Sequence, residues 1–344
     1  MKSNSKSIKL NVLFRVSGGR AIGKELGMGH VYRCINLAKQ LEVNSINFAI
    51  EDYGGVIQVL KSHNFKNIFR LKKKISIDDD IKNIKKIIQK NNIHLLIIDK
   101  YDRSVKKISK ELRKVITTIV ISDLKKIDYN ADLIINGFIG FKNSIIKNRF
   151  DSKCLIGPKY QILSKNYQTN KRNKKKKNTL LATFGGFDEN NISEIIYKEM
   201  IKIPKINGKI IIGPVTNNQK LRKIISKKQE KIQIISHVKN LKNEIQNTKF
   251  GVCSGGITTY EFAALNVPFG IICQYKHQKQ TAKEWSKRNL AINLGFPNKN
   301  LPKKLSRLLI GLSVNKYPKF NYKKIVDGLG TKRVVKEIMK LPIK

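Results

Sequence analysis

The sequence lacks the long apolar runs of a membrane protein. No stretch of its 344 residues approaches the roughly 20 consecutive apolar residues that a membrane-spanning helix requires. The first ten residues are basic and polar, and the short apolar run that follows stops at Gly18-Gly19-Arg20. That run has neither the apolar core nor the cleavage site of a signal peptide. We therefore expect a cytoplasmic protein.

Cysteine is scarce and unpaired. The four cysteines are Cys34, Cys154, Cys253 and Cys273. No two of them form a C-x-x-C pair, and none lies in a cluster with histidines. A disulfide framework or a structural zinc site is therefore not expected, and each cysteine is expected to act as a small buried apolar residue.

Acidic residues are few: 24 against 70 lysines and arginines, which gives a formal net charge of +46. The lysines are scattered among isoleucine and asparagine, as an AT-rich genome would encode, and the one dense run, at residues 171–177, is typical of a linker. No basic stripe interleaved with aromatic residues is present, so we expect no specific nucleic-acid partner. Weak association with an anionic membrane surface stays open, because it requires no motif.

Strand-like and helix-like segments alternate along the chain, which is long enough for two domains. In the first half, strands are predicted at residues 11–16, 46–50, 93–99, 117–122, 133–136 and 154–157, and helices at 31–41, 56–63, 80–91 and 105–115. In the second half, strands are predicted at 179–184, 209–212, 232–235, 250–253 and 269–273, and helices at 192–203, 219–229, 241–247, 258–265, 280–289, 301–312 and 332–339. Such alternation indicates an α/β fold with parallel sheets.

We predict two Rossmann-like lobes with a central cleft. The N-terminal lobe would comprise residues 8–168 and the C-terminal lobe residues 179–344, with a basic linker at 169–178 between them.

A histidine preceded by two glycines stands between the first predicted strand and the first predicted helix. Gly27-Met28-Gly29-His30 leads into a helical pattern that also contains Arg33. In open α/β sheets, ligands bind at the carboxyl ends of the strands, where a helix N-terminus favours an anion. An imidazole at that place can exchange a proton near neutral pH. The alternative is that His30 only caps or packs the helix.

Two glycine-rich turns follow strands in the second half. They are Thr183-Phe184-Gly185-Gly186-Phe187-Asp188 and Cys253-Ser254-Gly255-Gly256-Ile257-Thr258-Thr259-Tyr260-Glu261. Backbone N–H groups in such turns can hold phosphate oxygens without a metal. Glu261, inside the following helix, could accept hydrogen bonds from ribose hydroxyls. The alternative is that the glycines only make tight turns and that Glu261 is a solvated helix residue.

Several motifs occur in one order from Arg15 to Arg333. They are Arg15, the segment from Gly27 to Cys34, Asp99-Lys100-Tyr101, Asp123, Leu155-Ile156-Gly157-Pro158-Lys159-Tyr160, Phe184 to Asp188, Gly255 to Glu261, Pro268 with Gln278, and Asp327-Gly328 with Gly330 and Arg333. In this order they resemble the UDP-sugar hydrolases of pseudaminic acid biosynthesis, which act on UDP-2,4-diacetamido-2,4,6-trideoxy sugars. That family is related to MurG-type glycosyltransferases and shares their GT-B architecture.

The resemblance implies a UDP-sugar hydrolase that needs no metal or other cofactor. His30 would act as the general base for water, and Tyr101 would orient the sugar or the water. The residues implied to bind the substrate are Arg15, Gly29, Arg33, Asp99, His277 and Gln278. Those implied to bind the nucleotide are Gly185, Gly186, Ser254, Gly255, Gly256, Thr258 and Glu261. The last helix, at 332–339, would pack back toward the N-terminal lobe.

Two features depart from the family pattern. The segment at residues 17–24 is longer than the usual loop before the glycine–histidine motif, and His277 stands where the resemblance leads us to expect asparagine. Tyr101 could instead be a packed wall residue, and Asp99 could cap a helix or support the site from behind.

Four other functions stay open. One is a basic nucleic-acid binder, whose affinity would fall steeply with salt. A glycosyltransferase would keep the fold and nucleotide site but pass the sugar to a sugar or lipid hydroxyl, and a nucleotide-sugar binding protein would need no His30. A P-loop NTPase is suggested by Gly18-Gly19-Arg20-Ala21-Ile22-Gly23-Lys24, but the next residue is Glu25 in place of the magnesium-binding hydroxyl.

Overall fold

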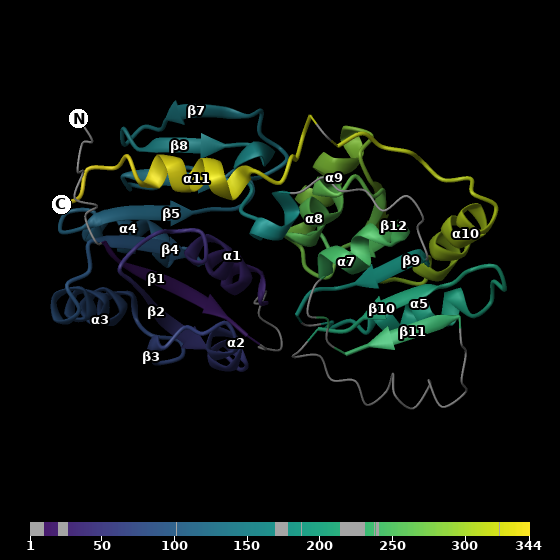
Figure 1. The fold of residues 1–344 in the computed structure, drawn as a ribbon, viewed down its shortest axis with the longest axis horizontal. Helices are drawn as coiled ribbons and strands as arrows, with labels where there is room; N and C mark the ends of the chain where they lie inside the picture. The colour runs from purple at the N-terminus through teal and green to yellow at the C-terminus, as the bar shows by residue number, and fades with distance from the viewer. Residues whose placement is uncertain are drawn as a thin grey trace, which may run out of the picture.

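The computed structural model describes residues 10–19, 27–100, 102–168, 178–186, 188–213, 231–236, 238, 241–322 and 324–344. Within them the chain forms two α/β lobes side by side, each built on its own sheet (Figure 1). The predicted fold class is therefore confirmed. Four predicted features lie wholly or mainly outside the described residues: Tyr101, the basic run at 171–177, the helix at 219–229 and the P-loop-like segment at 18–24 beyond residue 19.

The N-terminal lobe contains an eight-stranded sheet in which the edge strand β7 runs antiparallel to its neighbour and all other pairs are parallel. Its strands stand in the order β3-β2-β1-β4-β5-β6-β8-β7. They are β1 (Asn11–Gly18), β2 (Ser45–Asp52), β3 (Asn67–Leu71), β4 (Leu95–Asp99), β5 (Thr117–Ile121), β6 (Leu133–Asn136), β7 (Ser144–Lys147) and β8 (Lys153–Ile156). The order reverses between β1 and β4, as in doubly wound sheets.

Helices cover both faces of this sheet. They are α1 (Gly29–Ala38), α2 (Val56–Ser62), α3 (Ile77–Lys90) and α4 (Ser104–Leu112), and two short 3-10 turns follow, η1 (Pro158–Tyr160) and η2 (Lys165–Gln168). Strand β1 is buried on both faces, since helices cover both sides of the sheet. Side chains alternate along a strand, so successive residues of β1 pack into different cores. Phe14 and Val16 share a core with α1, whereas Leu13 packs with α3 and α4 on the other face. Even and odd positions of β1 therefore face different layers.

The C-terminal lobe repeats the same winding with a parallel six-stranded sheet in the order β11-β10-β9-β12-β13-β14. Its strands are β9 (Asn178–Thr183), β10 (Gly208–Ile211), β11 (Ile232–Ile235), β12 (Thr248–Cys253), β13 (Phe269–Ile272) and β14 (Ile292–Gly295). Its described helices are α5 (Ile192–Met200), α7 (Leu241–Gln246), α8 (Thr258–Ala264), α9 (Gln278–Lys287) and α10 (Leu301–Ser313). This order reverses between β9 and β12.

Three observed strands were not predicted from the sequence. They are β3, β7 and β14, and each is the outermost strand of its sheet. An edge strand is covered on fewer sides than a central one, so its sequence carries a weaker apolar signal. β7, for example, has no buried residue, and Ile145 is half exposed. The missed strands lie away from the places where the sheet orders reverse.

The last helix, α11 (Gly330–Ile338), lies against the N-terminal lobe (yellow in Figure 1). Val334 and Ile338 belong to the same core as β1 and α1. Thr331 Oγ1 accepts a hydrogen bond from the Leu163 backbone N–H at 2.9 Å. Beyond the helix, the Lys344 backbone N–H lies 3.1 Å from Thr117 Oγ1. None of the described helices combines the length and apolarity needed to cross a lipid bilayer.

Candidate active site

The two places where the sheet orders reverse face one cavity. His30 stands at the start of α1, the helix that follows β1, and paired glycines follow β9 and β12 in the other lobe. With its open mouth included, the cavity holds about 1090 Å³. Its lining residues from the N-terminal lobe are Gly27, Met28, Gly29, His30, Arg33, Asp123, Leu124, Phe138 and Gln161. Those from the C-terminal lobe are Phe184, Gly185, Gly186, Ser254, Gly255, Gly256, Ile257, Thr258, Tyr260, Gln274, Tyr275, His277, Gln278 and Thr281.

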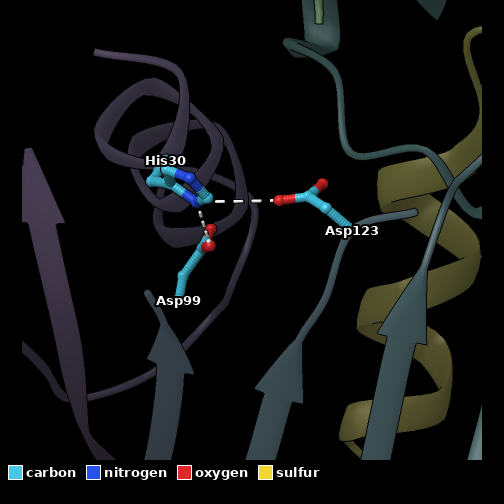
Figure 2. A group of neighbouring side chains, drawn as sticks. All are labelled: His30, Asp99 and Asp123. Carbon is cyan, nitrogen blue, oxygen red and sulfur yellow. Dashed lines mark hydrogen bonds and ion pairs between the residues drawn. The ribbon is translucent and has the colours of Figure 1, made fainter. Parts of the chain in front are cut away.

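His30 and Arg33 form the N-terminal wall together with two aspartates from neighbouring strand ends. Figure 2 shows Asp99, at the end of β4, and Asp123, just after β5, both directed toward the His30 ring. Asp99 Oδ1 lies 2.6 Å from His30 Nδ1. His30 and Arg33 are three residues apart, so they share one face of α1.

The Arg33 guanidinium binds both aspartates. It donates to the two oxygens of Asp99 at 2.8 and 2.7 Å and to those of Asp123 at 2.6 and 3.0 Å. Such bidentate pairs fix geometry as well as charge. His30, Asp99 and Asp123 also have the ligand types of a metal site, with candidate atoms within 4.8 Å of one another. The guanidinium already bridges both carboxylates, so a metal ion would have to displace Arg33.

Burial and neighbouring charges set the pKa values of His30 and Asp99. Burial lowers the pKa of His30, but the charge of Asp99 and its hydrogen bond raise it more, so the pKa lies above the ordinary 6.5. Burial raises the pKa of Asp99, but Arg33 and His30 lower it further, so this carboxyl stays ionised near neutral pH. A carboxylate on Nδ1 orients the imidazole and leaves Nε2 as its proton acceptor, the arrangement of a general base.

The glycine turns form the facing wall. Gly185 has φ +78°, a conformation that favours glycine, and a Cβ on Gly186 would lie 2.6 Å from Met28 Cγ in the other lobe. The glycines therefore let the two lobes approach closely. Gly255 and Gly256 precede α8, whose first residue, Thr258, also lines the cavity. Backbone N–H groups at such a turn suit phosphate oxygens.

Gln278 and Gln274 connect the strand ends of this lobe. Gln278 Oε1 accepts a hydrogen bond from the Gln274 backbone N–H at 2.8 Å, and Gln274 Nε2 donates to the Phe184 carbonyl at 2.9 Å. Gln274 Oε1 is buried with no hydrogen-bond partner among the described residues. His277 stacks on Tyr275, with ring centroids 5.7 Å apart.

Most of the predicted site residues meet in the cavity, but four do not line it within the described chain. Tyr101 lies outside the described residues. Asp99 is fully buried behind His30, where it supports the histidine. Glu261 is also absent from the lining, and Thr258 and Tyr167 hydrogen-bond to it. These hydrogen bonds lower the pKa of Glu261, but burial outweighs them and raises it to about 7.

Arg15 is placed away from the cavity, although the sequence suggested a substrate-binding role. It is an odd-numbered residue of β1, so its side chain shares the face of Leu13 under α3. There it is fully buried and donates to Glu51 at 2.7 Å and to both oxygens of Asp80 at 2.8 Å. This charge network is structural.

Asp123 and Gln274 are among the cavity residues that received no predicted role. Asp123 was matched to a motif only, and Gln274 was not singled out. Both follow the carboxyl end of a parallel strand, Asp123 after β5 and Gln274 after β13, and that position was the available signal.

The comparisons with known proteins agree with this architecture. No protein-family model matches the chain. An uncharacterized protein of Methanocaldococcus jannaschii, MJ1062, is 30% identical over 288 residues, which cover 77% of this chain and 56% of that protein. The spore coat polysaccharide biosynthesis protein SpsG of Bacillus subtilis is 26% identical, covering 91% of this chain and 94% of SpsG. The UDP-2,4-diacetamido-2,4,6-trideoxy-beta-L-altropyranose hydrolase of Campylobacter jejuni is 25% identical, covering 83% of this chain and 100% of that enzyme.

Solved structures share the fold at low sequence identity. MurG of Acinetobacter baumannii has a TM-score of 0.62 at 12% identity, covering 96% of this chain and 100% of MurG. UDP-GlcNAc 2-epimerase of Neisseria meningitidis, bound to UDP-GlcNAc, has a TM-score of 0.59 at 10% identity, covering 96% of this chain and 100% of the epimerase. The chain is therefore a distant homologue of the UDP-2,4-diacetamido-2,4,6-trideoxy-beta-L-altropyranose hydrolase and of SpsG, built on the GT-B fold of MurG.

Proposed function

We propose that the protein is an enzyme that hydrolyses a UDP-linked diacetamido-trideoxy sugar to UDP and the free sugar. The product would serve the synthesis of a pseudaminic-type nonulosonic acid and, through it, a surface polysaccharide. Homology to the altropyranose hydrolase and to the spore coat polysaccharide protein supports this substrate class. The observation that carries the proposal is the His30–Asp99 pair facing paired glycine turns in one cavity.

In this mechanism the nucleotide binds the C-terminal lobe. Backbone N–H groups of the turns at Gly185-Gly186 and Ser254-Gly255-Gly256 would hold the diphosphate, with Thr258 at the start of α8. Glu261 does not line the cavity, so for it to accept the ribose hydroxyls as predicted, the nucleotide would have to displace the Tyr167 hydroxyl. Gln278 holds the Gln274 backbone and so keeps the end of β13 in position beside the substrate.

His30 would then activate water from the facing wall. Nδ1–H donates to Asp99, and Nε2 removes a proton from the water as its oxygen bonds to the anomeric carbon. The bond from the anomeric carbon to the β-phosphate oxygen breaks, and its electron pair leaves with UDP. N–H groups of the glycine turns would stabilise that charge, which makes UDP a good leaving group.

A MurG-like glycosyltransferase is the second candidate, because MurG shares the fold over nearly the whole chain. His30 would then remove a proton from an acceptor hydroxyl in place of water. The two reactions share the donor site and differ in the molecule that attacks the anomeric carbon.

The test is UDP release from a panel of UDP-sugars that includes diacetamido-trideoxy hexoses, with EDTA present. We expect UDP release in water alone. In His30→Ala the rate of release should fall about 10²–10⁴-fold, the range that a general base contributes. His63→Ala is the matched control, because His63 lies outside the cavity, beside Lys39.

UDP release that requires an added acceptor or membranes would indicate that the protein is a glycosyltransferase and not a hydrolase. Isomerisation of the sugar without release would indicate an epimerase. Equal rates in wild type and His30→Ala would remove His30 from the mechanism.

A further inference from the structure

The N-terminal wall of the cavity is locally acidic in a strongly basic protein. The chain carries a net charge of +46, yet the charged groups around His30 are one guanidinium and two carboxylates. With His30 neutral, as a general base must be, this wall has a net negative charge. An anionic diphosphate is therefore repelled from this wall and favoured at the facing glycine turns.

Asp123 is the carboxylate of this wall that can meet a ligand. Asp99 is fully buried, and its oxygens already bind His30 and Arg33. The Asp123 side chain is 36% exposed and lines the cavity. Its two oxygens each accept one hydrogen bond from Arg33, so each retains capacity for a second donor.

The position of Asp123 places it beside the His30 ring, on the lining of the same cavity. Asp123 Oδ2 lies 3.9 Å from His30 Nδ1. Although burial raises the pKa of Asp123, the charge and hydrogen bonds of Arg33 hold it far below the ordinary 3.8. The group is thus an anion throughout the neutral range, and it can only accept hydrogen bonds.

We propose that Asp123 selects the sugar: its carboxylate accepts hydrogen bonds from hydroxyl or acetamido N–H groups and rejects sugars that carry a carboxylate. The inference rests on the proposed function, in which the sugar lies between the glycine turns and His30. It assigns the substrate to the neutral and amino sugars and excludes nucleotide-linked uronic acids. Like charges brought together in a binding site weaken binding, and rejection of this kind is a common source of specificity.

The test compares two ligands that differ only at the sixth carbon. UDP-glucose carries a hydroxymethyl group there, and UDP-glucuronate carries a carboxylate. Isothermal titration calorimetry on the wild-type protein is expected to show UDP-glucuronate binding at least about tenfold more weakly. We call the difference in affinity between UDP-glucose and UDP-glucuronate the gap. In Asp123→Asn the gap should narrow to about twofold, because Arg33 is retained and the repelling charge is gone. Asp123→Ser provides a second neutral variant should the asparagine variant fold poorly.

Two controls isolate the effect. Asp128→Asn removes the same charge from a surface residue paired with Lys106 and Arg149, and it should keep the wild-type gap. UDP alone lacks the hexose that Asp123 is proposed to select, so its affinity should be the same in wild type, Asp123→Asn and Asp128→Asn. Equal binding of the two sugars by the wild-type protein would overturn the proposal. So would a gap that Asp128→Asn narrows as much as Asp123→Asn does.

Binding is measured without turnover, which separates this inference from the proposed hydrolysis. A protein that shows the Asp123-dependent gap but releases UDP from no sugar refutes the hydrolase and keeps the selection. A protein that hydrolyses a UDP-sugar but binds UDP-glucose and UDP-glucuronate equally supports the hydrolase and refutes the selection by Asp123.

Discussion

Replacing Asp99 by asparagine tests whether His30 is a general base. The substitution keeps the shape of the side chain but removes the charge 2.6 Å from His30 Nδ1 and weakens two hydrogen bonds from Arg33. An asparagine can also turn its amide N–H toward Nδ1, which stabilises the wrong tautomer. We expect kcat to fall about 10²–10⁴-fold, the range that a positioned base contributes.

The pH profile gives the stronger signature. A base works in its neutral form, so kcat/KM of the wild-type protein should fall as the pH drops through the pKa of His30, which lies above 6.5. Burial lowers that pKa and the charge of Asp99 raises it. In Asp99→Asn the acidic limb should therefore move to lower pH.

The assay is initial-rate UDP release between pH 5 and 9, with Asp128→Asn as the control for loss of one carboxylate. Breaking a buried ion pair costs about 3–5 kcal/mol, and because Arg33 keeps two bonds to Asp123 we expect the lower end and a folded protein. A variant that keeps both the wild-type rate and the wild-type acidic limb would refute the His–Asp mechanism.

Three further predictions follow from buried contacts. Gly213→Ala should weaken UDP binding about tenfold in calorimetry, because its Cβ would collide with the Gly185 carbonyl and displace the glycine turn. Arg15→Met should lower the free energy of unfolding in urea by about 3–5 kcal/mol while KM changes less than about twofold, and a large rise in KM would return Arg15 to the substrate site. Glu261 has a folded pKa of about 7, above its ordinary 4.5, so its contribution to stability is present below pH 4.5 and is lost as the pH rises to about 7. Urea denaturation should show Glu261→Gln gaining stability relative to wild type across that range, and a constant difference would contradict the raised pKa.

The sequence predicts those parts of the fold whose signal is local. The run before Gly27 and the helical pattern after His30 place the histidine at a strand end without any tertiary information, and α1 begins at Gly29. The edge strands β3, β7 and β14 escape prediction, because half-exposed strands do not need a continuous apolar sequence.

Side-chain direction and distant pairing were beyond local reasoning. Arg15 and Val16 are adjacent in β1 but face opposite layers, and the partners of Arg15 stand 36 and 65 residues away in sequence. Likewise, no spacing rule joins Arg33 to Asp123 across 90 residues. Motif order could identify such residues as important but could not assign them to the cavity or to the core.

The placement of α11 makes the N-terminal lobe a discontinuous unit, with the C-terminal lobe inserted between its two parts. Val334 and Ile338 complete a core that otherwise consists of residues before position 163. During synthesis the N-terminal lobe can begin to fold early, since domains fold as the chain emerges. Its core stays open until the final helix has left the ribosome, so the C-terminal lobe has the opportunity to fold first to completion. The lobe that carries His30 would then be the last to become stable, and the wall of the cavity around His30 would be fixed only once α11 has been synthesised.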